Sequence, residues 1–163
     1  MMRSMRRGAV LLGLGLGLSG CATLGQLGIQ APQFRVDGSQ QAQLRLVPGG
    51  AVVRLYARVA NPNPIGVVLS RVAGGLELQG RDAARVDFPL GIPLQGGQET
   101  VVPLDIRVNF DDIPTLGSVL LRAVTGQSIG YRLNGTVGVD AGLLGQPTFG
   151  PMTLLEGDVR VAR

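Results

Sequence analysis

The sequence contains no histidine, no lysine and no tryptophan, and it has a single cysteine, Cys21. Without imidazole and with only one thiol, the chain lacks the groups for Ser-His-Asp or Cys-His catalytic sites and for the usual zinc sites. One cysteine also excludes a disulfide within the chain, so the fold depends on burial. Aromatic residues make up only 4% of the chain, which predicts a core of Val, Leu, Ile and Ala.

The single cysteine follows a patterned N-terminal segment. Three arginines within the first seven residues precede an apolar stretch over 9–18, and Leu18-Ser19-Gly20 leads directly to Cys21. A charged region, a short apolar region and a small-residue cleavage site are the parts of a secretory signal peptide. The apolar stretch is shorter than the ~20 residues that a membrane-spanning helix needs. With cysteine directly after the small residues, the segment resembles the lipobox of bacterial lipoproteins.

The lipobox resemblance implies that residues 1–20 are a lipoprotein signal peptide, that Cys21 becomes the lipid-bearing N-terminus, and that 21–32 form a tether. We therefore expect a cell-envelope protein that is anchored to the membrane by lipid. Ala22 after the cysteine resembles the signal for outer-membrane sorting, facing the periplasm in a diderm host. Without residues 1–20, twelve arginines oppose eleven acids, so the net charge falls from +4 to +1. Nucleic acid is not expected as a partner.

Alternation of apolar and polar residues dominates the rest of the chain. It is found in 52–60, 101–110, 131–140 and 153–162, with shorter stretches near 42–47, 68–79 and 83–88. Turn residues such as Pro48-Gly49-Gly50 separate these stretches. One apolar face opposite one polar face is typical of antiparallel sheets that share a core. About seven such strands predict a mainly β protein, an antiparallel β-sandwich of the Ig/FnIII-like type.

One segment follows a helical period instead. After Asp112, the apolar residues are spaced as on one face of a helix: Leu116, Val119, Leu120, Ala123 and Val124. Asp111 or Asp112 can cap the N-terminus, Pro114 fits the first turn, and Gly126 can end the helix. The sequence therefore predicts one helix near 113–125, of roughly three turns, packed on the sandwich.

The polar residues give no catalytic, cofactor or metal site. The strand carboxylates fall on the polar faces, where a solvated surface explains them. Asp111 and Asp112 have the oxygen ligands of a hard cation, but no ligand loop surrounds them and helix capping explains them. Arg54 and Arg58 flank Tyr56 on one strand face. This stripe either binds an anionic group or is a solvated outer face, with the apolar stems of the arginine side chains lying flat along the surface.

The predicted strand over 52–60 runs into a distinctive motif, Asn61-Pro62-Asn63-Pro64. Each proline lacks a donor N–H and pushes the residue before it away from the helical region. Asparagine side chains can bond nearby backbone and stabilise a turn. The motif thus predicts a structural turn, a rigid corner where the chain changes sheet.

The order of segments around this motif resembles the WHy domain, the group 2 late embryogenesis abundant family. An alternating strand precedes the motif, a polar segment over 95–99 follows later, and the strand over 131–137 looks like a later strand of the family. The resemblance covers 33–163. It implies a β-sandwich with one helix, no catalytic residues, and association with desiccation and stress through protection of other proteins.

Two functions follow from these expectations. The first is a non-enzymatic, lipid-anchored envelope protein of the desiccation and stress-protection type, acting on client proteins. The alternative is an envelope binding module that docks a protein partner or carries lipid. A large apolar pocket between helix and sheets would favour lipid carriage, whereas a tightly packed core would favour protection.

Overall fold

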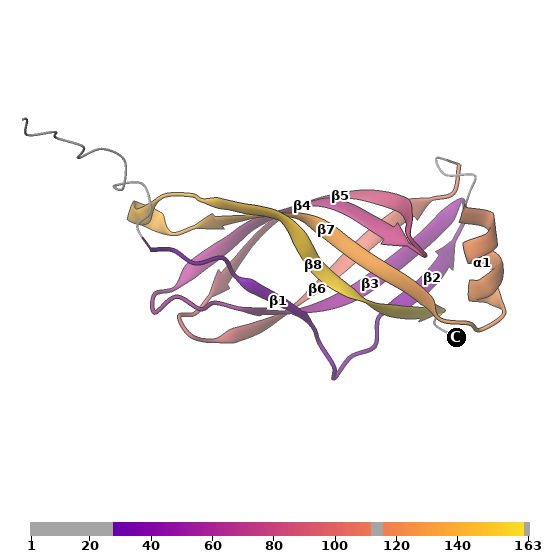
Figure 1. The fold of residues 1–163 in the computed structure, drawn as a ribbon, viewed down its shortest axis with the longest axis horizontal. Coiled ribbons are helices and arrows are strands. Elements are labelled where there is room, and N and C mark those ends of the chain that lie inside the picture. Colours follow the sequence, from indigo (N-terminus) through magenta and orange to yellow (C-terminus); the bar gives the residue numbers. More distant parts are fainter. Residues whose placement is uncertain (1–27, 112–115, 162–163) are drawn as a thin grey trace, which may run out of the picture.

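The computed structural model describes residues 28–111 and 116–161, which form an elongated, mainly β body with one short α-helix (Figure 1). In chain order the elements are β1 Gln33–Val36, β2 Gln43–Val47, β3 Gly50–Ala60, β4 Val67–Leu78, β5 Arg81–Leu94, β6 Glu99–Asn109, α1 Gly117–Val124, β7 Ile129–Asp140, the 3-10 turn η2 Gly142–Leu144, and β8 Thr148–Val161. The mainly β class predicted from the alternation is confirmed.

The eight described strands belong to one continuous mixed sheet. Its order runs β6-β3-β2-β8-β7-β4-β5, with β1 paired to β3 beyond the end of β2. Within it, β1, β2, β3 and β6 pair antiparallel, as do β4, β5, β7 and β8. A short parallel pairing of β2 with β8, Gln43 to Arg160 and Leu44 to Val161, joins these two halves. Because the sheet is continuous and mixed, the specific Ig/FnIII-like sandwich stays a prediction.

The two halves of the sheet share one hydrophobic core. Figure 1 shows β4, β5 and β7 passing across β3 and β6. The fully buried side chains include Leu55 and Leu104 from the first half and Leu76 and Leu133 from the second. Successive strand residues point to opposite faces, so the alternation places these leucines inside. Burial of each such side chain is worth roughly 1.5–3 kcal/mol.

β1 and β2 lie along the same edge of β3 as one interrupted strand. β1 pairs with residues 57–60 and β2 with residues 50–54 of β3. Between them, residues 37–42 leave the edge, and the backbone N–H of Asp37 donates to the Tyr56 carbonyl at 2.9 Å. The interruption therefore presents Asp37 to the polar side of β3.

The helix is shorter than the sequence predicts. α1 covers only Gly117–Val124, its N-cap position is Leu116, and no side chain caps it. The predicted cap at Asp111 is therefore wrong, whereas the predictions for Asp112 and Pro114 lie outside the described residues. Leu116 is buried, so core packing rather than an acidic cap sets the start.

The C-terminal end of α1 agrees with the sequence. Gly126 has φ +80°, and its N–H donates to the Ala123 carbonyl at 3.1 Å. A left-handed residue of this kind commonly ends helices, and glycine adopts it without steric cost. No helix in the described ranges is long and apolar enough to cross a membrane.

Candidate functional site

The Asn-Pro-Asn-Pro motif forms the turn between β3 and β4, here called the corner (residues 61–66). Asn61 and Asn63 are each only 1% exposed. The Asn61 Nδ2 donates to the Ile65 carbonyl at 2.8 Å and to the Leu94 carbonyl at 3.0 Å. Its Oδ1 accepts from the backbone N–H and the Nδ2 of Asn63, at 3.0 and 2.9 Å. One buried side chain thus ties the corner to itself and to the end of β5.

Asn63 ties the corner to the chain that precedes β1. Its Nδ2 donates to the Gln30 carbonyl at 3.0 Å, and its Oδ1 accepts from the Gln30 N–H at 2.8 Å. This reciprocal pair satisfies one donor and one acceptor of residue 30 in the manner of a strand partner. The chain is therefore fixed to the domain from Gln30 onward.

The turn between β5 and β6 closes over the corner. The Gly97 N–H donates to the carbonyls of Asn61 and Asn63, each at 3.0 Å. A Cβ placed on Gly96 would lie 2.5 Å from the Pro64 carbonyl oxygen. Only glycine allows this close approach. The corner is thus a packed junction of three chain segments.

The structure brings the predicted motif residues together. Asn61 and Asn63 point into the junction, whereas Pro62 is half-buried and Pro64 is exposed. The predicted lipidation site Cys21 lies outside the described residues. The sequence indicated the turn but not its partners, because Gln30 and Leu94 are remote in the chain.

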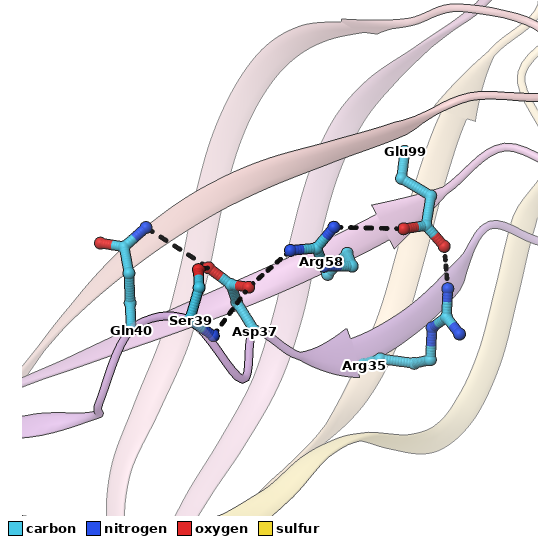
Figure 2. A network of polar contacts seen from close by, with 6 residues as sticks. All are labelled: Arg35, Asp37, Ser39, Gln40, Arg58 and Glu99. Carbon is cyan, nitrogen blue, oxygen red and sulfur yellow. Dashed lines mark hydrogen bonds and ion pairs between the residues drawn. The ribbon is translucent and has the colours of Figure 1, made fainter.

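A second polar cluster surrounds Asp37, whose side chain is fully buried. Figure 2 shows the six residues that form it: Arg35, Asp37, Ser39, Gln40, Arg58 and Glu99. The Arg58 Nη2 donates to the Asp37 Oδ1 at 2.7 Å, and the Ser39 Oγ donates to Oδ2 at 2.8 Å. Arg58 also reaches Glu99 at 3.4 Å, and Glu99 forms an ion pair with Arg35. The cluster fastens β1 and the 37–42 turn onto β3.

The Asp37 carboxylate is stabilised by the groups that face it. The hydrogen bond from Arg58, followed by that from Ser39, lowers the pKa of Asp37 from 3.8 to about 2. A buried charge is tolerated only when it is paired and hydrogen-bonded. We did not predict this cluster, although the turn residues Asp37-Gly38-Ser39 offered a local signal for it.

The arginine stripe predicted on β3 is occupied by carboxylates. Arg54 donates two hydrogen bonds of 2.6 Å to Asp105, and Arg58 binds Asp37 and Glu99. The hydrogen bond from Arg54 lowers the pKa of Asp105. Each of these partners comes from a neighbouring strand or turn. The stripe thus presents cations that are already paired within the chain.

The surface hollows of the described residues do not point to one chemical site. One hollow, of about 800 Å³, lies between β4, β5 and β6. Charged and small residues line it: Gly74, Gly75, Asp82, Ala83, Ala84, Arg85, Arg107 and Asn109. Among the described residues, no group of three His, Cys, Asp or Glu side chains is placed to hold a metal ion.

Comparison with known families decides the assignment. The sequence profile described as "Late embryogenesis abundant protein" matches residues 56–153, which is 98 of the 163 residues. The chain belongs to the late embryogenesis abundant protein family. No curated protein sequence matches it. The matched range begins within β3 and includes the corner, so the resemblance indicated by the motif and its flanking segments is confirmed.

Two solved structures are similar to this chain in fold. The late embryogenesis abundant chain described here is similar to the solution structure of AT1g01470 from Arabidopsis thaliana, with a TM-score of 0.61 and 18% identity over 82% of this chain and 83% of that one. It is also similar to the solution structure of At2g46140.1, assigned to the late embryogenesis abundant (LEA) proteins, with a TM-score of 0.57 and 19% identity over 86% of this chain and 75% of that one. At these identities the likeness shows the fold alone.

Proposed function

We propose that this chain is a non-enzymatic envelope lipoprotein that protects client proteins during desiccation or related stress. The observation that carries the protective role is the family match over residues 56–153. The observation that carries the location is the segment from Arg3 to Cys21, which resembles a lipoprotein signal peptide. Ala22 after the cysteine favours the outer membrane, facing the periplasm in a diderm host.

The geometry of the domain supports an anchor at its N-terminal side. The chain is fixed to the corner at Gln30 by two hydrogen bonds with Asn63. Eight residues, 22–29, separate this point from Cys21. Two or more acyl chains give stable membrane attachment, since each buried CH₂ contributes ~0.8 kcal/mol. A lipid on Cys21 would then hold the domain close to the bilayer.

The side-chain chemistry supports a role without catalysis. The chain has no histidine, and its only thiol is the proposed lipid site. The carboxylates of Asp87, Asp105 and Glu156 each accept hydrogen bonds from an arginine on a neighbouring strand. Their pKa values are lowered by these bonds, which suits stable ion pairs rather than proton transfer near neutral pH.

The packing of the domain favours protection over lipid carriage. The residues that α1 buries, Leu116, Val119 and Ala123, belong to the same core as the strands. A hollow beside α1 measures about 160 Å³, and it is lined by Gln79, Arg81, Ser118, Val119 and Arg122. We propose that a folded, hydrated domain held at the membrane separates client proteins as water is lost.

The anchor is tested by mass and fractionation. Intact-mass analysis of the membrane fraction should show loss of residues 1–20 and a gain of diacylglyceryl and acyl mass on Cys21. Cys21→Ala should leave the membrane as a folded protein, with unchanged circular dichroism. An unmodified N-terminus, or retention of the variant on the membrane, would remove the anchor from the proposal.

The protective role is tested by drying. A desiccation-sensitive enzyme is dried and rehydrated with the mature chain, from residue 21 with Cys21→Ala, or with an inert globular protein of equal mass. We expect a larger recovered activity with the mature chain at equal mass ratios. Equal recovery with both proteins would count against protection. Partner capture without protection would favour the binding-module alternative.

A further inference from the structure

One end of the domain carries exposed apolar side chains on turns. Leu143 in η2 is 106% exposed, Leu144 is 39% exposed, and Ile65 in the corner is 40% exposed. Single exposed leucines are common on protein surfaces. Three such side chains on turns of one end, with the full side chain of Leu143 in solvent, present apolar surface there.

This end is where the chain arrives from Cys21. Gln30 is bonded to Asn63 of the corner. The corner and η2 lie side by side, because Gly66, Leu94 and Gly142 line one common hollow. In Figure 1 the indigo start of the described chain, before β1, and the turn between β7 and β8 lie at the same end of the body, and α1 lies at the opposite end. We call this end, made of residues 28–32, 61–66, 95–98 and 141–148, the tether end.

The tether end carries no charged residue in any of its four segments. The nearest charged residue in the chain to η2, Asp140, is bound within its own loop. Its Oδ1 accepts from the Gly142 N–H at 2.8 Å, and its Oδ2 accepts from Gln146 at 3.1 Å. The opposite end differs, since Arg81 and Arg122 lie beside α1. The uncharged surface faces the side from which the chain arrives.

Backbone hydrogen bonds hold Leu143 and Leu144 outward. The Ala141 N–H donates to the Gly145 carbonyl at 2.9 Å, and the Leu144 N–H donates to the Ala141 carbonyl at 3.2 Å. Together with the Asp140 bonds, these contacts define the turn before any partner binds. A preformed turn loses little conformational freedom on binding.

The connecting chain is long enough for this end to meet a bilayer. Residues 22–29 are uncharged. The nine steps from Cys21 to Gln30 reach at most roughly 30 Å when extended, and about 17 Å as a flexible coil. A lipid on Cys21 would therefore keep the tether end within reach of the headgroups.

We propose that the tether end docks on the lipid bilayer, with Leu143 and Leu144 entering the interface and Ile65 at its edge. This inference rests on the proposed anchor at Cys21. Apolar side chains gain from burial at the acyl boundary, and the four uncharged segments of the tether end avoid the cost of moving charge out of water. The domain then stands with α1 away from the membrane.

The absence of tryptophan from the chain allows a direct test with one introduced fluorophore. The mature protein carrying Leu143→Trp, as processed by the host, is reconstituted in phosphatidylcholine vesicles, with and without brominated acyl chains. The matched control carries Leu121→Trp on α1, where the native leucine is 66% exposed. We expect Trp emission at 143 to move to shorter wavelength and to be quenched by brominated lipid, with neither change at 121.

A charge variant separates insertion from mere proximity. Adding Leu144→Asp to the Leu143→Trp protein should restore water-like emission, because the carboxylate resists leaving water. Adding Val124→Asp, at a position 60% exposed on α1, should leave the lipid response unchanged.

Each outcome has a clear meaning. Water-like emission at 143 in protein that floats with the vesicles would overturn docking while leaving the anchor intact. Protein that does not float would overturn the anchor, and docking would then stand only if the emission of Leu143→Trp still responds to vesicles. A blue shift without lipid that grows with protein concentration would show self-association instead, and would overturn the bilayer as the occupant.

Discussion

At the scale of single residues, two buried polar side chains decide how the N-terminal part attaches to the domain. Asn61 uses its amide donors on two carbonyls and its oxygen on Asn63. Asp37 uses both carboxylate oxygens on Arg58 and Ser39. No buried side-chain N or O atom of the described residues lacks a hydrogen-bond partner. Removing either side chain would leave partners unsatisfied where water cannot replace it.

Asn61→Ala should destabilise the domain by roughly 2–4 kcal/mol, since buried carbonyl and amide groups lose their partners. Asn61→Asp should be destabilising as well, because it removes the two donors. Urea unfolding at 25 °C measures both. The control is Gln41→Ala at an exposed position, which should stay within ~0.5 kcal/mol. A wild-type midpoint for Asn61→Ala would show that the corner is dispensable.

The lowered pKa of Asp37 should make the free energy of unfolding depend on pH. Its pKa is lowered from 3.8 to about 2 in the folded chain. A carboxyl with a depressed folded pKa stabilises the fold above its unfolded pKa, and this contribution is lost as the pH falls through the folded pKa. Asp37→Asn should therefore be less stable than wild type above pH 4, with the difference shrinking from about pH 4 to pH 2.

Urea midpoints at several pH values measure this difference. Asp111→Asn, at an exposed position, serves as the control and should follow the wild-type curve. A gap between wild type and Asp37→Asn that stays constant down to pH 2 would mean that the Asp37 charge does not contribute.

At the scale of elements, glycines allow β4 and β7 to approach closely. Gly74 is paired with Gly135 across the two strands. A Cβ on Gly74 would overlap the Asn134 carbonyl oxygen, and one on Gly135 would overlap the Ala73 carbonyl oxygen. Glycine inside a strand commonly marks such a backbone approach. The neighbouring Gly75 is different, since the nearest atom to its Cβ would be the Ala84 oxygen at 3.8 Å.

Gly74→Ala should therefore cost about 3 kcal/mol or more, because backbone must shift to admit the methyl group. Gly75→Ala, one residue away, should stay within ~0.5 kcal/mol or stabilise slightly, because alanine reduces the freedom of the unfolded strand. Thermal or urea unfolding of the two variants compares them directly. Equal losses of stability in the two variants would show that the β4–β7 pairing relaxes around the methyl group. Glycine would then not be required at position 74.

At the scale of the whole molecule, one core joins the two halves of the sheet. Among the described strands, direct pairing between the halves is limited to the short contact of β2 with β8. Buried residues of both halves belong to one cluster, which also includes Leu116 of the helical region. Neither half can bury its apolar face without the other. The domain should therefore unfold as one unit.

The introduced tryptophans provide a test of this cooperativity. Without lipid, Leu143→Trp reports on the tether end and Leu121→Trp on α1 at the other end. We expect the two fluorescence transitions in urea to coincide with each other and with far-UV circular dichroism. An earlier transition at one end would show that this end unfolds separately and that the shared core does not couple the halves.

The sequence predicted the fold where a local period or a turn residue carries the information. The stretches near 52–60, 101–110 and 131–140 correspond to β3, β6 and β7 within a few residues. Gly126 ends the helix as expected. The start of α1 was missed, because burial of Leu116 rather than a local cap sets it. The Asp37 cluster was also missed, because it depends on the Arg58 partner from another strand.

By itself, the sequence determined the β class, the aliphatic core, the corner and the absence of histidine and a second thiol, because these follow from period, composition and local backbone restriction. Only the tertiary structure decided that Asn63 holds Gln30, that Arg54 and Arg58 are already paired, and that Ile65 and Leu143 share the end at which the chain arrives. These contacts join residues far apart in the chain, so they exist only after the strands have paired and the core has closed.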